Sequence, residues 1–210
     1  IGMNIMRSVH RLLSPLIYRD GTAIVPAQVA PEWAERQFLR RLLHRLRVDC
    51  VIDVGANVGQ YANILRLIGF QGTILSFEPS PQIFAKLASA SAHDDRWHVF
   101  DSALGAEAGT IEFNIMEASE FSSVRQPTRR DTAQFESDNQ VVERIHVAIE
   151  RLDQVLPRLR DAYGFQRPFL KTDTQGFDIE VLRGAAGVHR ELAGIECELA
   201  IKELYVDVKP

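Results

Sequence analysis

The chain has 210 residues, of which 46% are hydrophobic and 25% are charged. This balance is typical of one globular domain and excludes collagen-like, coiled-coil and disordered chains. No stretch approaches the roughly 18 consecutive apolar residues of a membrane span, so we expect no transmembrane segment. The two cysteines are too few for a disulfide framework, which favours a reducing, cytoplasmic location.

The net charge of −4 is distributed unevenly along the chain. Residues 1–47 hold eight arginines against Asp20, Glu32 and Glu35, a net charge of +5 that leaves −9 on the remainder. An acidic main body argues against a nucleic-acid partner, because phosphate binding needs a concentrated basic face. The basic N-terminal region is suited to peripheral contact with an acidic partner or a membrane surface, and a solvated helix face is the simpler alternative.

Apolar residues at helical spacing predict an amphipathic helix over residues 32–47, which we assign to an N-terminal helical extension, residues 1–47. The main domain, residues 48–210, then alternates short apolar runs with helical segments. Such alternation predicts a parallel sheet with right-handed crossovers. Strands are expected at 50–55, 73–78 and 97–104, and helices at 60–69 and 81–91.

The alternation breaks after residue 104. Two half-exposed strands are expected at 110–115 and 145–152, and the long polar segment 116–144 between them is predicted to be a lid loop. Asp153 is a suitable N-cap for the helix that follows. The parallel pattern then returns, and since its last strand ends near residue 201, we expect a sheet that lacks its last one or two strands, by truncation or by nature. These elements are a helix at 154–161, a strand at 169–176, a helix at 178–186 and a strand at 194–201.

The segment Asp53-Val54-Gly55-Ala56-Asn57-Val58-Gly59 lies where the first strand turns into the first helix, which is where ligands bind in doubly wound sheets. A dinucleotide fingerprint would need glycines where Asn57 and Gln60 stand, and the chain has no Gly-Lys-Ser/Thr tripeptide of a phosphate loop. Glu78 ends the second strand, where a carboxylate can accept hydrogen bonds from both hydroxyls of a ribose. The alternative is that Glu78 caps the helix that begins near Pro81.

Four segments, VIDVGANVGQY, SFEPSP, ALG and LKTDTQGFDIEVLRGA, together resemble the FkbM family of S-adenosylmethionine-dependent methyltransferases over residues 48–200. The resemblance implies a Rossmann-like, doubly wound, mostly parallel α/β sheet of the class I methyltransferase type. It also implies S-adenosyl-L-methionine as cofactor and the hydroxyl of a sugar, glycolipid or polyketide-type natural product as methyl acceptor. Thr172, Thr174 and Asp178 depart from the residues usual in the family.

The same resemblance implies a role for individual residues. The loop under the methionine half of the cofactor would contain Asp53, Gly55, Ala56, Asn57 and Gly59. Glu78 would hold the ribose, with Pro79 beside it in the cofactor site. Asp101, Ser102 and Ala103 would flank the adenine, and Asp173, Thr174 and Gln175 would stand near the sulfonium and the acceptor.

Asp173 is the predicted catalytic residue, because it ends a strand at the ligand-binding edge and its carboxylate can accept the proton of an attacking hydroxyl. The alternatives are that Asp173 binds the cofactor's ammonium group or caps the helix near Asp178, and that Glu196 or Glu198 is the base. Glu198 is also a candidate substrate residue. Ser122 and Ser123 either bind the acceptor or cofactor or merely belong to a polar loop.

No histidine pair, HExxH or CxxC motif has metal-ligand spacing, so no catalytic metal is expected. Two other functions stay open. One is a catalytically silent, methyltransferase-like binding domain. The other is a nucleotide-dependent oxidoreductase, which the two missing glycines disfavour.

Overall fold

The protein was analysed as a computed structural model, which describes residues 28–116, 124 and 141–197. The chain divides into two compact units, residues 1–42 and 43–210. The helix expected over 32–47 is present as α2 (Ala30–Arg45). Every motif discussed above lies in the second unit. No helix among the described residues combines the length and apolar character that a membrane crossing requires.

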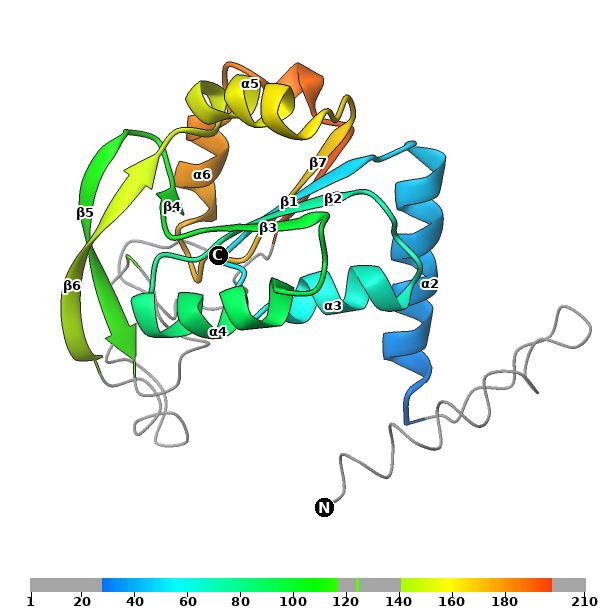
Figure 1. Cartoon of the computed structure of the whole chain (residues 1–210), viewed down its shortest axis with the longest axis horizontal. Helices are drawn as coiled ribbons and strands as arrows, with labels where there is room; N and C mark the ends of the chain where they lie inside the picture. The colour runs from blue at the N-terminus through cyan, green and yellow to red at the C-terminus, as the bar shows by residue number, and fades with distance from the viewer. Residues whose placement is uncertain (1–27, 117–123, 125–140, 198–210) are drawn as a thin grey trace, which may run out of the picture. The chain divides into compact units, whose positions relative to one another are not determined.

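The second unit is built on a five-stranded, fully parallel sheet with the order β3-β2-β1-β7-β8. The first strand lies at its centre, and the strand order reverses there (Figure 1). This is the predicted doubly wound, Rossmann-like arrangement, in which ligands bind at the carboxyl ends of the central strands. The strands are β1 (Cys50–Val54), β2 (Thr73–Phe77), β3 (Trp97–Phe100), β7 (Pro168–Thr172) and β8 (Gly194–Cys197).

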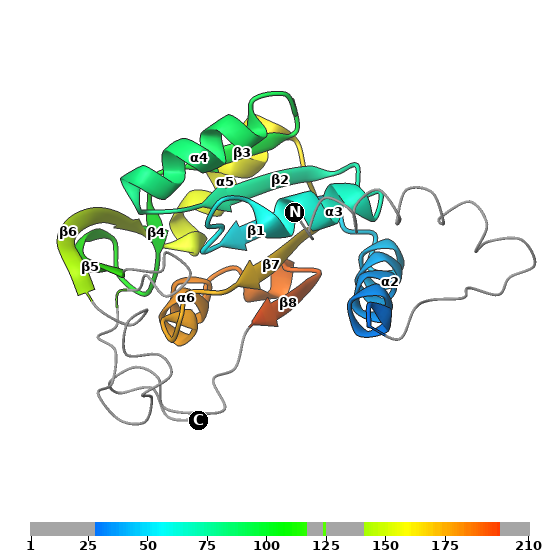
Figure 2. The ribbon, with the colours of Figure 1, turned by 90° about the horizontal axis from the view of Figure 1, so that it is seen from below.

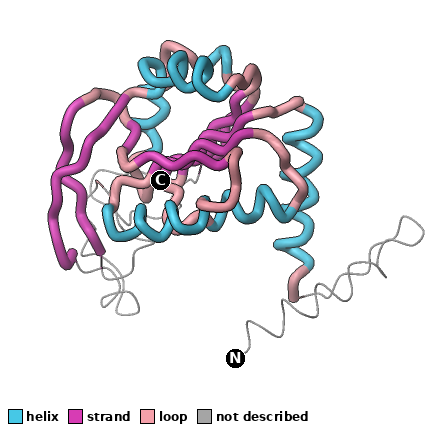
Figure 3. The backbone as a smooth tube through the Cα atoms, viewed as in Figure 1, coloured by secondary structure: helices cyan, strands magenta, loops and turns pink. Residues whose placement is uncertain are grey.

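Helices cover both faces of this sheet (Figures 1 and 3). On one face lie α3 (Gln60–Leu67) and α4 (Pro81–Ser91), and on the other lie α5 (Leu152–Tyr163) and α6 (Asp178–Gly184), which a 3-10 turn (His189–Glu191) follows. Alternate residues of the central strands point toward α5 and α6, and most of these residues are hydrophobic, so this face of the sheet is mainly apolar. Its fully buried members include Ile52, Leu75, Leu156, Leu170 and Val181.

A second sheet of three strands lies beside the first (Figure 2). Its order is β4-β6-β5, with β4 (Ala103–Leu104) parallel to β6 (Val141–Glu150) and β5 (Gly109–Met116) antiparallel to it. The prediction of a single strand over 97–104 was therefore wrong, because this segment forms the two strands β3 and β4. The chain bends at Asp101–Ser102, and Ala103 pairs with Ile149 of β6 rather than with β2.

Two further expectations need correction. Residues 141–144, assigned to the loop, belong to β6, and Met116 ends β5. Helix α5 begins at Leu152 with Arg151 as its N-cap, so Asp153 is not the cap. Asp153 instead forms an ion pair of 2.6 Å with Arg151. Most of the expected lid (117–123 and 125–140) and residues 198–210 lie outside the described ranges.

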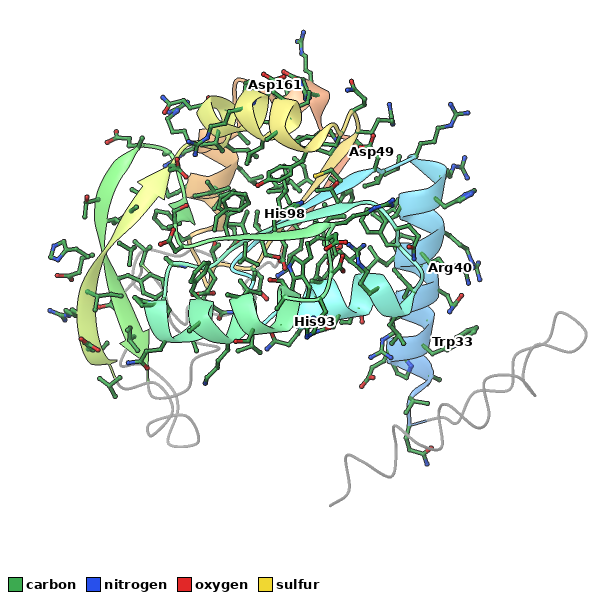
Figure 4. The ribbon with its side chains drawn as sticks, in the orientation of Figure 1. Trp33, Arg40, Asp49, His93, His98 and Asp161 are labelled. Atoms are coloured by element: carbon green, nitrogen blue, oxygen red, sulfur yellow. The ribbon has the colours of Figure 1, made fainter. Side chains whose placement is uncertain are left out.

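Two titratable side chains that lie away from the carboxyl edge have structural contacts. Asp49 precedes β1 at its amino end (Figure 4), and its carboxylate accepts the backbone N–H groups of Gln166 and Arg167 at 2.9 and 2.7 Å. The His98 ring stacks on Tyr163 with centroids 4.0 Å apart. Burial lowers the pKa of His98.

Candidate functional site

The loop that follows β1 is tied to the end of β2 by backbone hydrogen bonds. The N–H groups of Gly55 and Ala56 both donate to the carbonyl oxygen of Phe77, at 3.1 and 3.0 Å. The Gly59 N–H donates to the carbonyl oxygen of Ala56 at 2.9 Å, which closes the turn into α3. The loop is thus a fixed structure at the carboxyl edge of the sheet, next to the topological switch point.

The glycines of this loop make room for other parts of the protein. Gly55 and Gly59 both have positive φ, at 76° and 89°. A Cβ on Gly55 would lie 2.0 Å from the carbonyl oxygen of Asp173, and one on Gly59 would lie 2.6 Å from the ring of Trp97. The two glycines let the ends of β1 and β7, and the indole ring of Trp97, approach this loop closely.

Glu78 holds the loop and the start of α4 together. Its Oε2 accepts the N–H of Asn57 at 3.0 Å, and its Oε1 accepts the N–H of Ser80, the N-cap of α4, at 2.9 Å. The residue is 6% exposed. Burial raises the pKa of Glu78 to about 7, although both backbone hydrogen bonds favour the ionised form. The helix-start contact expected as an alternative is therefore present, and each carboxylate oxygen retains capacity for a second donor.

Asp173 follows β7 at the same edge of the sheet. Its N–H donates to the carbonyl oxygen of Val54 at 3.0 Å, and its Oδ1 accepts the side-chain amide of Gln175 at 2.9 Å. The side chain is 37% exposed, so it is accessible from solvent. In the turn between β7 and α6 it is Asp178 whose Oδ1 accepts a backbone N–H, that of Thr174, at 3.2 Å. The N-cap of α6 is Phe177, so the helix-cap alternative for Asp173 was wrong.

Asp53 lies at a different depth from Asp173. Its side chain is completely buried, and its Oδ1 lies 3.1 Å from the ammonium nitrogen of Lys171 on β7. The sequence analysis assigned no role to Lys171, although the segment LKTDTQGFDIEVLRGA contains it. The sequence feature that could have identified it is a lysine within an otherwise apolar strand, because a buried charge needs a partner of opposite charge.

The residues expected around the adenine lie near the end of β3. Pro79 is buried and Asp101 is exposed. The Ser102 hydroxyl donates to Glu150 Oε2 at 3.1 Å, and Ala103 belongs to the apolar core. Ser122, Ser123 and Glu198 lie outside the described residues. Within the ranges that are described, no group of three or more His, Cys, Asp or Glu side chains could hold a metal ion.

The fold defines a Rossmann-like α/β domain, and a family profile identifies its family. The family profile described as "Methyltransferase FkbM domain" matches residues 53–197. The chain belongs to the FkbM methyltransferase domain family.

Two other proteins are similar to the chain. "Methyltransferase sdnD" of Sordaria araneosa is 26% identical in an alignment of 163 residues, which covers 68% of this chain and 62% of that protein. A crystal structure from Staphylococcus aureus, of a protein proposed to be a caffeoyl-CoA O-methyltransferase, superposes with a TM-score of 0.40 at 7% identity. The superposition covers 90% of this chain and 67% of the other.

Proposed function

We propose that the protein transfers a methyl group from S-adenosyl-L-methionine to a hydroxyl of a sugar, glycolipid or polyketide-type natural product. The observation that carries this proposal is the contact between the loop after β1 and Glu78 at the end of β2. A nucleoside ligand needs a carboxylate for its ribose beside a tight turn at this edge, and both are present on adjacent strands. Membership of the methyltransferase family supports the same cofactor.

The described residues fit this cofactor. Glu78 would accept hydrogen bonds from the two ribose hydroxyls, because each of its oxygens accepts one backbone N–H and has capacity for a second donor. The loop from Gly55 to Gly59 would support the methionine half, and Asp101, Ser102 and Ala103 would border the adenine. Pro79 would lie beside Glu78 in the cofactor site. Asp53 is fully buried, so we propose that it supports this loop from the interior of the sheet. When bound, S-adenosylmethionine supplies an electrophilic methyl group on a sulfonium.

Asp173 is the proposed catalytic residue of the transfer. A neutral hydroxyl attacks weakly, and a carboxylate within hydrogen-bond reach can orient it and accept its proton. Among the carboxylates at this edge, Asp173 combines solvent access with a fixed position, since Gln175 holds its Oδ1. Thr174 and Gln175 would line the same region. For the acceptor, Ser122, Ser123 and Glu198 stay predictions from the sequence, as does a cytoplasmic location.

Calorimetric titrations separate this function from its rivals. S-adenosylmethionine and S-adenosylhomocysteine should both bind, and NAD should not. An oxidoreductase would show the opposite preference. Turnover on a panel of hydroxylated sugars, glycolipids and polyketides, followed as release of S-adenosylhomocysteine, separates an enzyme from a silent binding domain. Binding of the cofactor with no turnover on any acceptor would favour the silent domain.

A further inference from the structure

Four polar side chains occupy matching positions on four neighbouring strands of the central sheet. Asp53 on β1 is in register with Ser76 on β2 and with Lys171 on β7, and Lys171 is in register with Glu196 on β8. Residues in register on parallel strands point to the same face, so these four side chains form a continuous row across the sheet. We call Ser76, Asp53, Lys171 and Glu196 the polar row.

Lys171 is the only cation of the polar row, and carboxylates surround it. Its ammonium nitrogen lies 3.1 Å from Asp53 Oδ1, 3.7 Å from Asp173 Oδ2 and 5.2 Å from the centre of the Tyr61 ring. The Tyr61 hydroxyl in turn donates to Glu196 at 2.8 Å. Burial works against the charge on Lys171, but Asp53, Asp173 and Glu196 outweigh it and raise the pKa of Lys171.

Asp173 has one contact at each oxygen of its carboxylate. Gln175 donates to Oδ1, and Lys171 lies nearest to Oδ2. The side chains of Lys171 and Asp173 come from positions two residues apart, on the same side of the chain at the end of β7. Of the two carboxylates nearest to Lys171, that of Asp53 is fully buried and that of Asp173 is partly exposed. The ammonium group thus links the interior of the sheet to the accessible carboxylate.

We propose that Lys171 is a positioning residue that shares its ammonium group between Asp53 and Asp173 and so holds the Asp173 carboxylate in place at the carboxyl edge. This rests on the proposed function, in which Asp173 serves the acceptor hydroxyl. The rival explanation is that Lys171 only neutralises the buried charge of Asp53. In that case its contact with Asp173 has no consequence.

Two variants of the polar row distinguish these explanations. Lys171→Met keeps the length of the side chain and removes its charge. Asp53→Asn combined with Lys171→Met also removes the buried carboxylate, so the interior is neutral again. Lys86→Met, on the exposed side of α4, is the matched control, and Asp173→Asn is the reference for a lost carboxylate.

The reporter is the side-chain amide NMR signal of Gln175 in cofactor-free protein, assigned by its absence in Gln175→Leu. Melting temperature is recorded for each variant, together with turnover at saturating cofactor on an active hydroxylated acceptor. The amide signal and the melting temperature need no catalysis. A failure of the proposed function appears separately, as wild-type protein that does not bind S-adenosylmethionine.

We expect Lys171→Met to melt roughly 5 °C or more below wild type, because it strands a buried carboxylate. The double variant should recover at least half of this loss. In both variants the Gln175 signal should move toward its position in Asp173→Asn, and turnover should fall on the order of 10²-fold, the effect of a misplaced reacting group. A double variant whose Gln175 amide signal is the same as in wild type would overturn the proposal. If Lys171→Met does not fold, the double variant alone provides the test.

Discussion

The two faces of the central sheet contrast in chemistry although the same strands form both. Toward α5 and α6 the strands present mainly apolar side chains, such as Ile52 and Leu75, with His98 stacked on Tyr163 as a polar exception. Toward α3 they present the polar row, with Asp53 and Lys171 at its centre. Hydrophobic burial sustains both faces, since Val51 and Ile74 on the α3 side are also fully buried, and the α3 side adds buried charge that organises the carboxyl edge.

The polar side should give the largest effect on catalysis. We expect Asp173→Asn to lower turnover on the order of 10²- to 10⁴-fold at saturating cofactor, since an amide cannot accept the proton. Its affinity for S-adenosylmethionine should stay within a few-fold of wild type. Kinetics with both substrates saturating, together with calorimetry, measure the two effects.

Asp161→Asn on the exposed side of α5 is the control for this substitution and should change neither quantity (Figure 4). An Asp173→Asn enzyme that binds the cofactor poorly but turns over normally at saturation would make Asp173 a binding residue.

The apolar side should give the largest effect on stability. Leu156 of α5 is fully buried, and Leu156→Ala should lower the free energy of unfolding by about 2–5 kcal/mol through lost burial and a cavity. Urea denaturation measures the change. Cofactor affinity of the folded variant should equal that of wild type. Leu67→Ala, at a 65% exposed position of α3, should have little effect on either property.

A smaller effect is expected at Glu78. Glu78→Gln should weaken S-adenosylmethionine binding by about 1.5–3 kcal/mol, the contribution of a hydrogen bond to a charged group, because an amide has one acceptor oxygen where the carboxylate has two. Glu143→Gln, at an exposed position of β6, is the control. An unchanged dissociation constant for Glu78→Gln would remove ribose recognition by this carboxylate from the account.

The smallest effect concerns pH. Burial raises the pKa of Glu78 to about 7, above its pKa in the unfolded chain. The protonated group therefore stabilises the fold at low pH, and this contribution is lost as the pH rises from the unfolded-state pKa through about 7. Binding to the ribose requires the ionised form. S-adenosylmethionine affinity should therefore fall up to tenfold per pH unit below 7, and Glu78→Gln should lack this dependence. Calorimetry between pH 5.5 and 7 measures it.

The sequence predicted most of the helices and strands of the main sheet, because each apolar run ends at a glycine, a proline or a polar residue. Helix α4 begins at Pro81 and ends at Ser91, as expected. The loop after β1 and Glu78 were also found, since each stands at the end of a predicted strand. Their presence at one edge followed from the expected parallel topology.

The remaining features depend on contacts that no local pattern shows. Ala103 and Leu104 form a separate strand because their partner in β6 lies more than forty residues further along the chain. The pairing of Lys171 with Asp53 depends on the register of β1 and β7, and the close approach at Gly55 depends on the path of the chain at Asp173. Such long-range packing becomes visible only when the strands are assembled.

The most direct test of the account is a crystal structure of the protein with S-adenosylhomocysteine. We predict the ribose hydroxyls within hydrogen-bond distance of Glu78, the methionine half along the loop from Gly55 to Gly59, and the sulfur on the side of Asp173. A ligand bound elsewhere, or one in this loop whose ribose does not contact Glu78, would contradict it.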